Sequence, residues 1–132
     1  MIETRAEAIA VETEFAARVD GIRARFVLKL ADKIPRIDVA LSRMTGDGSD
    51  AVDAVASAYR WFHDVSGIGS IIGFDATGRQ ARLCAAILIN SFRAQRCVSP
   101  DELASLRSGF GTFRVVALNE THFTELDQRS AP

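Results

Sequence analysis

The sequence is organised around the stretch WFHDVSGIGSIIGF, residues 61–74. His63, one of only two histidines in the chain, lies near its start. Gly67, Gly69 and Gly73 follow inside a segment that otherwise has helical character. Glycine in a helix interior costs about 0.5–1 kcal/mol relative to alanine. Repeated glycine beside a histidine therefore indicates a structural or functional requirement at this stretch.

Five segments of the chain are predicted to be helical. The strongest, residues 22–45, places apolar side chains at steps of three and four, which is the periodicity of one buried face. This pattern continues in register through Pro35, so we expect a single helix with a kink there. The other predicted helices cover residues 2–19, 51–72, 76–97 and a final segment that begins near residue 99.

Capping residues mark where three of these helices should begin. Ser49 or Asp50 can cap the helix over residues 51–72, and Asp75 can cap the next one. The run SPDE, residues 99–102, has a capping serine, a proline at the first helical position and a glutamate three residues after the serine. That combination is a capping box and predicts a helix start.

Glycines also predict interruptions. Gly21 is expected to loosen the chain between the first two helices. Gly109 and Gly111 should bend or briefly break the last helix near Gly109. Residues 112–118 have the β-branched and aromatic content of a strand, but a lone strand would have no partner, so we expect helix there.

Together these segments predict an all-α protein. We expect an antiparallel up-and-down four-helix bundle over residues 20–132, preceded by an accessory helix over residues 1–19, in a single domain. The stripe on the first helix is weak and alanine-rich, so this helix should bury little. We expect a monomer, with a dimer formed through the N-terminal helix as the alternative.

Composition and charge narrow the function classes. The 132 residues are 48% hydrophobic and 25% charged, with a net charge of −1, so no global field favours nucleic acid or an anionic membrane. No signal peptide and no apolar run of membrane-spanning length are visible, so we expect a cytoplasmic protein. Cys84 and Cys97 fit no metal or redox spacing, and both are expected to be buried free thiols in helices.

Charge is nevertheless segregated along the chain. Basic residues predominate over residues 23–43 and 79–96, and acidic residues over residues 47–64. One interpretation is that neighbouring helices present solvated faces of opposite charge. The other is that a basic rim surrounds a site that handles negative charge.

His63 does not fit a metal or hydrolase site. A helical zinc pair needs a second ligand one turn away, and that position is Gly67. The sequence has no serine–histidine–carboxylate signature, nucleophile elbow or phosphate-binding glycine loop after a strand, so no cofactor, metal or autonomous enzyme activity is expected. Most single histidines on helices have no task, but Gly67 removes side-chain bulk beside this one. An accessible imidazole is a competent nucleophile, and phosphoryl transfer asks mainly for positioning.

These residues resemble the signature of histidine-containing phosphotransfer (HPt) domains of bacterial two-component phosphorelays. That signature has a histidine, an apolar residue two positions on, usually lysine three on, glycine four on, small residues at five to seven and an apolar–glycine pair at nine and ten. The matching positions are His63, Val65, Gly67, Gly69, Ser70, Ile72 and Gly73. The resemblance covers about residues 20–126, and Pro35 falls where such domains often carry a proline.

The resemblance implies a phosphoryl carrier. His63 would accept and donate the phosphoryl group, and Gly67 would give clearance to the partner. Gly69, Ser70 and Gly73 would allow close helix packing and the turn to the next helix. The implied partners are a response-regulator receiver domain, a hybrid sensor histidine kinase or both, and the magnesium ion would belong to the receiver.

Two positions depart from the family pattern. Ser66 stands where lysine is usual, and Ile68 is larger than the usual small residue. Ser66 itself, or the arginines Arg60, Arg79 and Arg82, could serve the phosphoryl charge or docking, although each arginine also fits a solvated surface. These departures keep open an alternative: a helical interaction module that binds receiver domains or other proteins and is never phosphorylated.

Overall fold

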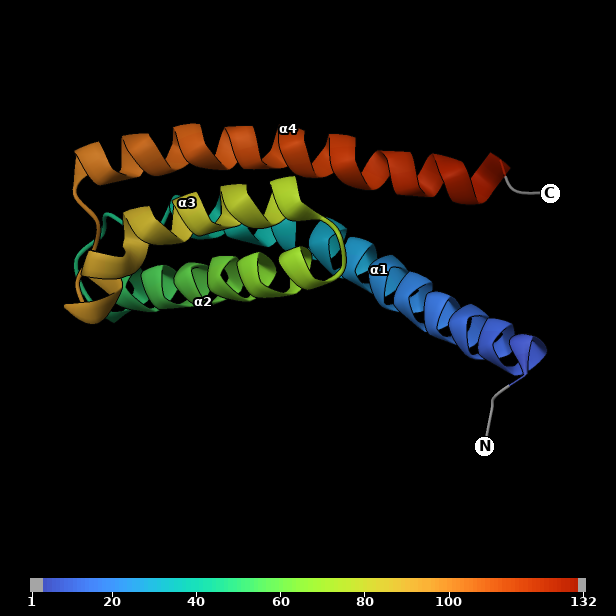
Figure 1. Cartoon of the computed structure of the whole chain (residues 1–132). Coiled ribbons are helices and arrows are strands. Elements are labelled where there is room, and N and C mark those ends of the chain that lie inside the picture. The colour runs from blue at the N-terminus through green and yellow to red at the C-terminus, as the bar shows by residue number, and fades with distance from the viewer. Residues whose placement is uncertain (1–3, 131–132) are drawn as a thin grey trace.

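The chain folds as a bundle of helices. The computed structural model describes the backbone of residues 4–130 and the side chains of residues 4–121. This part contains four helices and no strand: α1 (Arg5–Leu41), α2 (Ser49–Ile71), α3 (Asp75–Arg93) and α4 (Pro100–Ser130). Successive helices run in opposite directions (Figure 1), which confirms the predicted all-α, antiparallel bundle. No helix of the described chain is long and apolar enough to cross a membrane.

The first two predicted helices are one. α1 continues through Gly21 and through Pro35, so the predicted loosening at Gly21 is wrong and the predicted continuity through Pro35 is confirmed. A single glycine costs only about 1 kcal/mol in a helix, and the flanking alanine, glutamate and arginine residues favour helix. A capping box that sequence analysis missed secures the N-terminus: Thr4 Oγ1 accepts from the Glu7 amide, and the Glu7 carboxylate accepts from the Thr4 amide.

The N-terminal half of α1 projects beyond the bundle (Figure 1). Its side chains are almost all exposed, including Ile9, Val11 and Phe15. The C-terminal half contributes Phe26, Leu30, Ile37 and Leu41 to the core. The segment predicted as an accessory helix is therefore an extension of the first bundle helix.

The core lies between the four helices. Phe62 from α2, Leu88 from α3 and Phe113 from α4 are fully buried, and Met44 closes the core from the connection between α1 and α2. α2 and α3 pack on each other far more extensively than α1 packs on α2 or α4. α2 and α3 therefore form the rigid centre of the bundle.

Helix starts differ from the predicted caps at two places. α2 begins after Gly48, whose φ of 103° favours glycine, and neither Ser49 nor Asp50 is the cap. α3 begins after Phe74 rather than being capped by Asp75. Its first amides are held from α4 instead: Glu120 accepts hydrogen bonds from the backbone N–H of Ala76 at 3.1 Å and of Thr77 at 2.9 Å. A carboxylate is well placed there because the helix dipole is positive at its N-terminus.

α3 ends at Arg93, earlier than predicted, because Gln95 takes a left-handed conformation with φ 51°. The N–H of Arg96 then donates to the carbonyl of Ser91, which completes the helix stop. Cys97 consequently lies half-buried in the connection to α4 and not in a helix, contrary to expectation. Cys84 is buried as predicted, and burial raises the pKa of its thiol to about 12.

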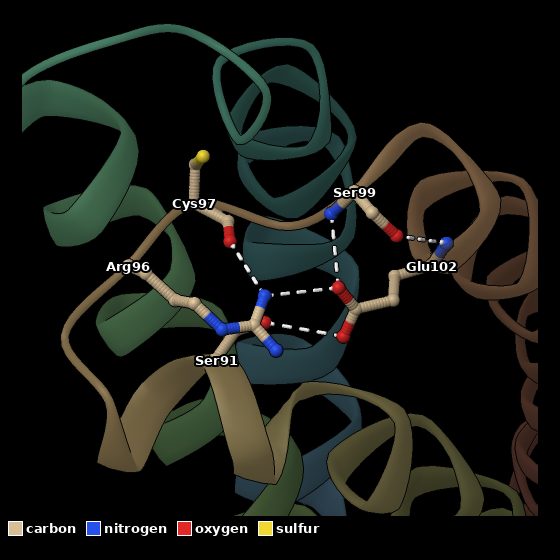
Figure 2. Close-up of polar contacts among 5 residues, drawn as sticks. All are labelled: Ser91, Arg96, Cys97, Ser99 and Glu102. Atoms are coloured by element: carbon tan, nitrogen blue, oxygen red, sulfur yellow. Dashed lines mark hydrogen bonds and ion pairs between the residues drawn. The ribbon is translucent and has the colours of Figure 1, made fainter.

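The capping box at the start of α4 forms as predicted (Figure 2). The Ser99 N–H donates to Glu102 Oε1 at 2.9 Å, and the Glu102 N–H donates to Ser99 Oγ at 3.1 Å. Glu102 also accepts from Arg96 Nη1 at 3.0 Å and from Ser91 Oγ at 3.2 Å, which ties α4 to the end of α3. The helix continues without a break through Gly109, because that glycine packs against Cys84 and Ile87 of α3. The helix therefore does not break near Gly109, and residues 112–118 are helical as expected.

Replacing Glu102 should make the pH dependence of stability shallower. Hydrogen bonds from the Ser99 backbone and from Arg96 lower the pKa of Glu102 from 4.5 to about 2. A lowered pKa in the folded state contributes stability that is present above pH 4.5 and is lost as the pH falls toward 2. We expect Glu102→Gln to lower the free energy of unfolding at neutral pH by about 1–2 kcal/mol.

Urea denaturation of both proteins at neutral pH and near pH 3 measures this effect. The difference between wild type and Glu102→Gln should shrink at the lower pH. Asp101→Asn, in the same first turn, is the matched control and should change stability little. An equal effect of Glu102→Gln at both pH values would contradict the assignment.

Candidate functional site

His63 lies on the outer face of α2 with its side chain exposed to solvent. Its ring stacks on Tyr59, one turn earlier, with the ring centroids 6.0 Å apart and the planes at 19°. Tyr59 in turn stacks on Phe92 of α3 at 4.3 Å. The imidazole is therefore accessible on one side and supported on the other by two half-buried rings that belong to the α2–α3 pair.

Space opens beside His63 at Gly67. A Cβ atom at Gly67 would have no neighbour within 4 Å outside its own stretch of helix. Gly67 follows His63 by one turn, so the two share a face of α2. Ile71 continues this face one turn further and is 84% exposed. The helix surface beside the imidazole therefore carries no side chain at Gly67 and is apolar one turn further, at Ile71.

Gly69 and Gly73 have structural roles. A Cβ at Gly69 would lie 3.2 Å from the carbonyl oxygen of Phe74 and 3.4 Å from Cα of Gly78, so α2 and α3 touch backbone to backbone there. Gly73 has φ 91° and ends α2, and the Phe74 N–H donates to the Gly69 carbonyl at 2.8 Å. Ser70 donates its hydroxyl to the Ser66 carbonyl at 2.9 Å, and its Oγ lies against Gly78.

Ser66 is turned inward. Its side chain is 8% exposed, and its hydroxyl donates to the backbone carbonyl of His63 at 2.8 Å. The hydroxyl therefore points into the helix and offers no group to a phosphate or a docking partner. Its short side chain fits the narrow space between α2 and α3.

Positive charge from α1 and from α2 meets at a surface hollow that includes Asp64. Arg60 and Lys33 line a surface hollow of about 530 Å³ together with Asp64, the residue after His63. The Arg60 guanidinium also lies over the Phe92 ring, 5.6 Å from its centroid. Arg79 and Arg82 are exposed on α3 and do not line this hollow. Arg60 was singled out from the sequence and Lys33 was not, because only the packing of α1 on α2 brings Lys33 to this hollow.

Comparisons with protein-family models, with curated proteins and with solved structures found no match for this chain.

The geometry alone therefore limits what the site can do. Within the described residues, no group of three histidine, cysteine or acidic side chains is placed to hold a metal ion. His63 is an exposed nucleophile on α2. Tyr59, which stacks on it, Ile71 on the same side of the helix and Lys33 in the nearby hollow were not singled out from the sequence. The spacing of Tyr59 and Ile71 from His63, one turn before and two turns after, is the sequence signal that could have found them.

Replacing Gly67 or Gly69 by alanine should change the stability of the fold in opposite directions. Gly67→Ala places a methyl group in open space and removes the helix cost of glycine, so it should stabilise the fold by about 0.5–1 kcal/mol. Gly69→Ala forces a methyl group against the backbone of Phe74 and Gly78, and it should destabilise by about 1 kcal/mol or more. Thermal or urea unfolding of the two variants checks this pair. Equal effects at both positions would show that the α2–α3 contact is looser than described.

Proposed function

We propose that the protein is a histidine phosphotransfer protein and that His63 carries the phosphoryl group. The observation that supports this most is the pairing of an exposed imidazole with the empty surface at Gly67 on one rigid helix. A small substrate would be served by a pocket, whereas open space over a flat helix face admits the active site of another protein. The resemblance of residues 63–74 to the HPt signature points the same way.

The chemistry needs one bond exchange. The unprotonated ring nitrogen of His63 attacks the phosphorus of an aspartyl phosphate on a receiver domain, a P–N bond forms, and the receiver's carboxylate leaves with the electron pair of the broken P–O bond. Transfer onward reverses these events at the aspartate of a second receiver. The Tyr59 ring, stacked on the imidazole, would limit its rotation and hold it ready for in-line attack.

Lys33 and Arg60 are the cations that could stabilise the phosphoryl charge in place of the lysine usual at position 66. Both line the hollow beside Asp64, and the Arg60 guanidinium also lies over the Phe92 ring of α3. Their charges would complement a dianionic phosphoryl group without being part of the reaction itself. In this role the protein would be a carrier with no kinase activity of its own, and it would act in the cytoplasm, where its receiver partners are.

The second candidate is a docking module that binds a receiver or another protein without being phosphorylated. Two observations favour it: Ser66 is buried where a phosphate-facing lysine is usual, and Ile68 and Ile71 are 46% and 84% exposed beside His63. An exposed apolar strip next to a low surface suits protein docking whether or not phosphate moves.

Phosphorylation of the full-length chain separates the two candidates. The protein is incubated with several phosphorylated receiver domains and a phosphorylated hybrid kinase, and radiolabel on the chain is tested for acid lability and alkali stability. We expect label with the stability of phosphohistidine on the wild type and none on His63→Gln.

Asp64→Asn is the matched control. It keeps a side chain of similar size at the position after His63, and this variant should still be labelled. Label that persists on His63→Gln would exclude the carrier proposal. Measurable receiver binding with no label from any donor would establish the docking module instead.

A further inference from the structure

One face of α1 carries two similar runs of small and apolar residues. In the projecting half, they are Ala6, Ile9, Thr13 and Ala16; in the bundle half, they are Ala24, Val27, Ala31 and Ile34. Both runs have steps of three, four and three, and they are five helical turns apart, so they lie on the same face of the helix. We call this face the α1 stripe. Between the two runs, Asp20 lies on this face.

The projecting half of the stripe is exposed among the described residues, and its side chains are small enough for close packing. Ile9 is 54% exposed, and Ala6, Thr13 and Ala16 are exposed as well. The Thr13 hydroxyl donates to the Ile9 carbonyl at 2.8 Å, so its polar group is satisfied within the helix. Small side chains of this kind allow another helix to approach closely.

The bundle half of the stripe borders an apolar groove between α1 and α4. The groove has a volume of about 600 Å³, and Val27, Ala31 and Ile34 form its α1 wall. Val115 and Leu118 form much of the α4 wall and are 59% and 66% exposed. An exposed apolar groove on a helical bundle is the usual receptor for an amphipathic helix.

The projecting half cannot fill the groove of its own chain. Ile9 and Ala31 lie on one continuous helix, 22 residues apart, which at 1.5 Å per residue is about 33 Å. The matching helix must therefore come from elsewhere, and a second copy of the chain supplies one.

We propose that two copies of the chain associate through α1, antiparallel across a two-fold axis, with the projecting half of each α1 lying in the α1–α4 groove of the other. Each copy contributes one helix and one groove, so the contact closes on itself as an isologous dimer. No residue that lines the groove comes from α2, the helix that carries His63.

The charge pattern of α1 favours this occupant over an unrelated helix. Acidic residues predominate in the projecting half, where Glu7, Glu12 and Glu14 accompany Arg5, whereas Arg18 and Asp20 lie close to the two-fold axis. Basic residues predominate over residues 23–43, where Arg23, Arg25, Lys29, Lys33, Arg36 and Arg43 accompany Asp32 and Asp38. Antiparallel pairing sets the acidic half of each copy against the basic half of the other, whereas parallel pairing would set like against like.

The residues that line the groove point to one ion pair between the two copies. Arg114 is the charged residue among the side chains that line the groove. At about 100° per residue, Glu12 lies beside the α1 stripe on the flank that would face α4 of the other copy. Glu12 of one copy and Arg114 of the other would then form an ion pair at the rim of the groove.

The mass of the full chain in solution tests the proposal. Sedimentation equilibrium from micromolar concentrations upward should show a reversible dimer. Ile9→Glu puts a charge into the apolar contact and should raise the dimer Kd by about tenfold or more. Val11→Glu is the matched control, because Val11 is two residues away, 61% exposed, and on the opposite side of the helix. It should change the dimer Kd by less than about threefold.

A charge exchange tests the orientation. Glu12→Arg and Arg114→Glu should each weaken the dimer, and the double variant Glu12→Arg/Arg114→Glu should recover most of the loss. Circular dichroism of each variant confirms that the helices are retained. A wild-type chain that stays monomeric would overturn the proposal. A dimer broken by Val11→Glu but not by Ile9→Glu, or a double variant weaker than both single variants, would overturn it as well.

Discussion

The contact between Gly69 of α2 and Gly78 of α3 is the constraint on which the site depends. The two backbones approach so closely that a methyl group at Gly69 would press on the Phe74 carbonyl at 3.2 Å. Such an approach fixes the rotation of α2 about its own axis relative to α3. With that rotation fixed, Ser66 must face inward, and His63 and Gly67 must face solvent. The exposure of the imidazole is therefore a consequence of packing several residues away.

Carboxylates from α4 hold both ends of α3. At one end, the Glu120 carboxylate from α4 accepts from the first amides of α3. At the other end, Glu102 joins Ser91, Arg96 and Ser99, so that the end of α3 and the start of α4 share one carboxylate (Figure 2). In the phosphotransfer role that we propose, such a frame would help to keep the nucleophile positioned before a partner binds.

Local patterns in the sequence predicted where helices form but not how the helices join. The apolar periodicity over residues 22–45 predicted the C-terminal half of α1, and the capping box at Ser99 predicted the start of α4, since both signals lie within a few residues of the structure that they specify. Gly21 and Gly109 did not break their helices, because the cost of one glycine is small against the helix on either side and, at Gly109, against its packing on α3. Glu120 capping α3 and Lys33 lying near Asp64 could not be predicted, because each joins residues far apart in the chain.

In the function that we propose, Gly67 keeps the approach to His63 open for another protein. This role of Gly67 is tested by measuring the rate of His63 phosphorylation in Gly67→Leu from two donors, a phosphorylated receiver domain and the small molecule phosphoramidate. Ala104→Leu, at an exposed position on α4, adds similar bulk away from the site and serves as the control. We expect Gly67→Leu to slow transfer from the receiver by about tenfold or more, a loss of about 1.4 kcal/mol, and to leave labelling by phosphoramidate unchanged. Equal rates from the receiver in Gly67→Leu and in wild type would contradict it.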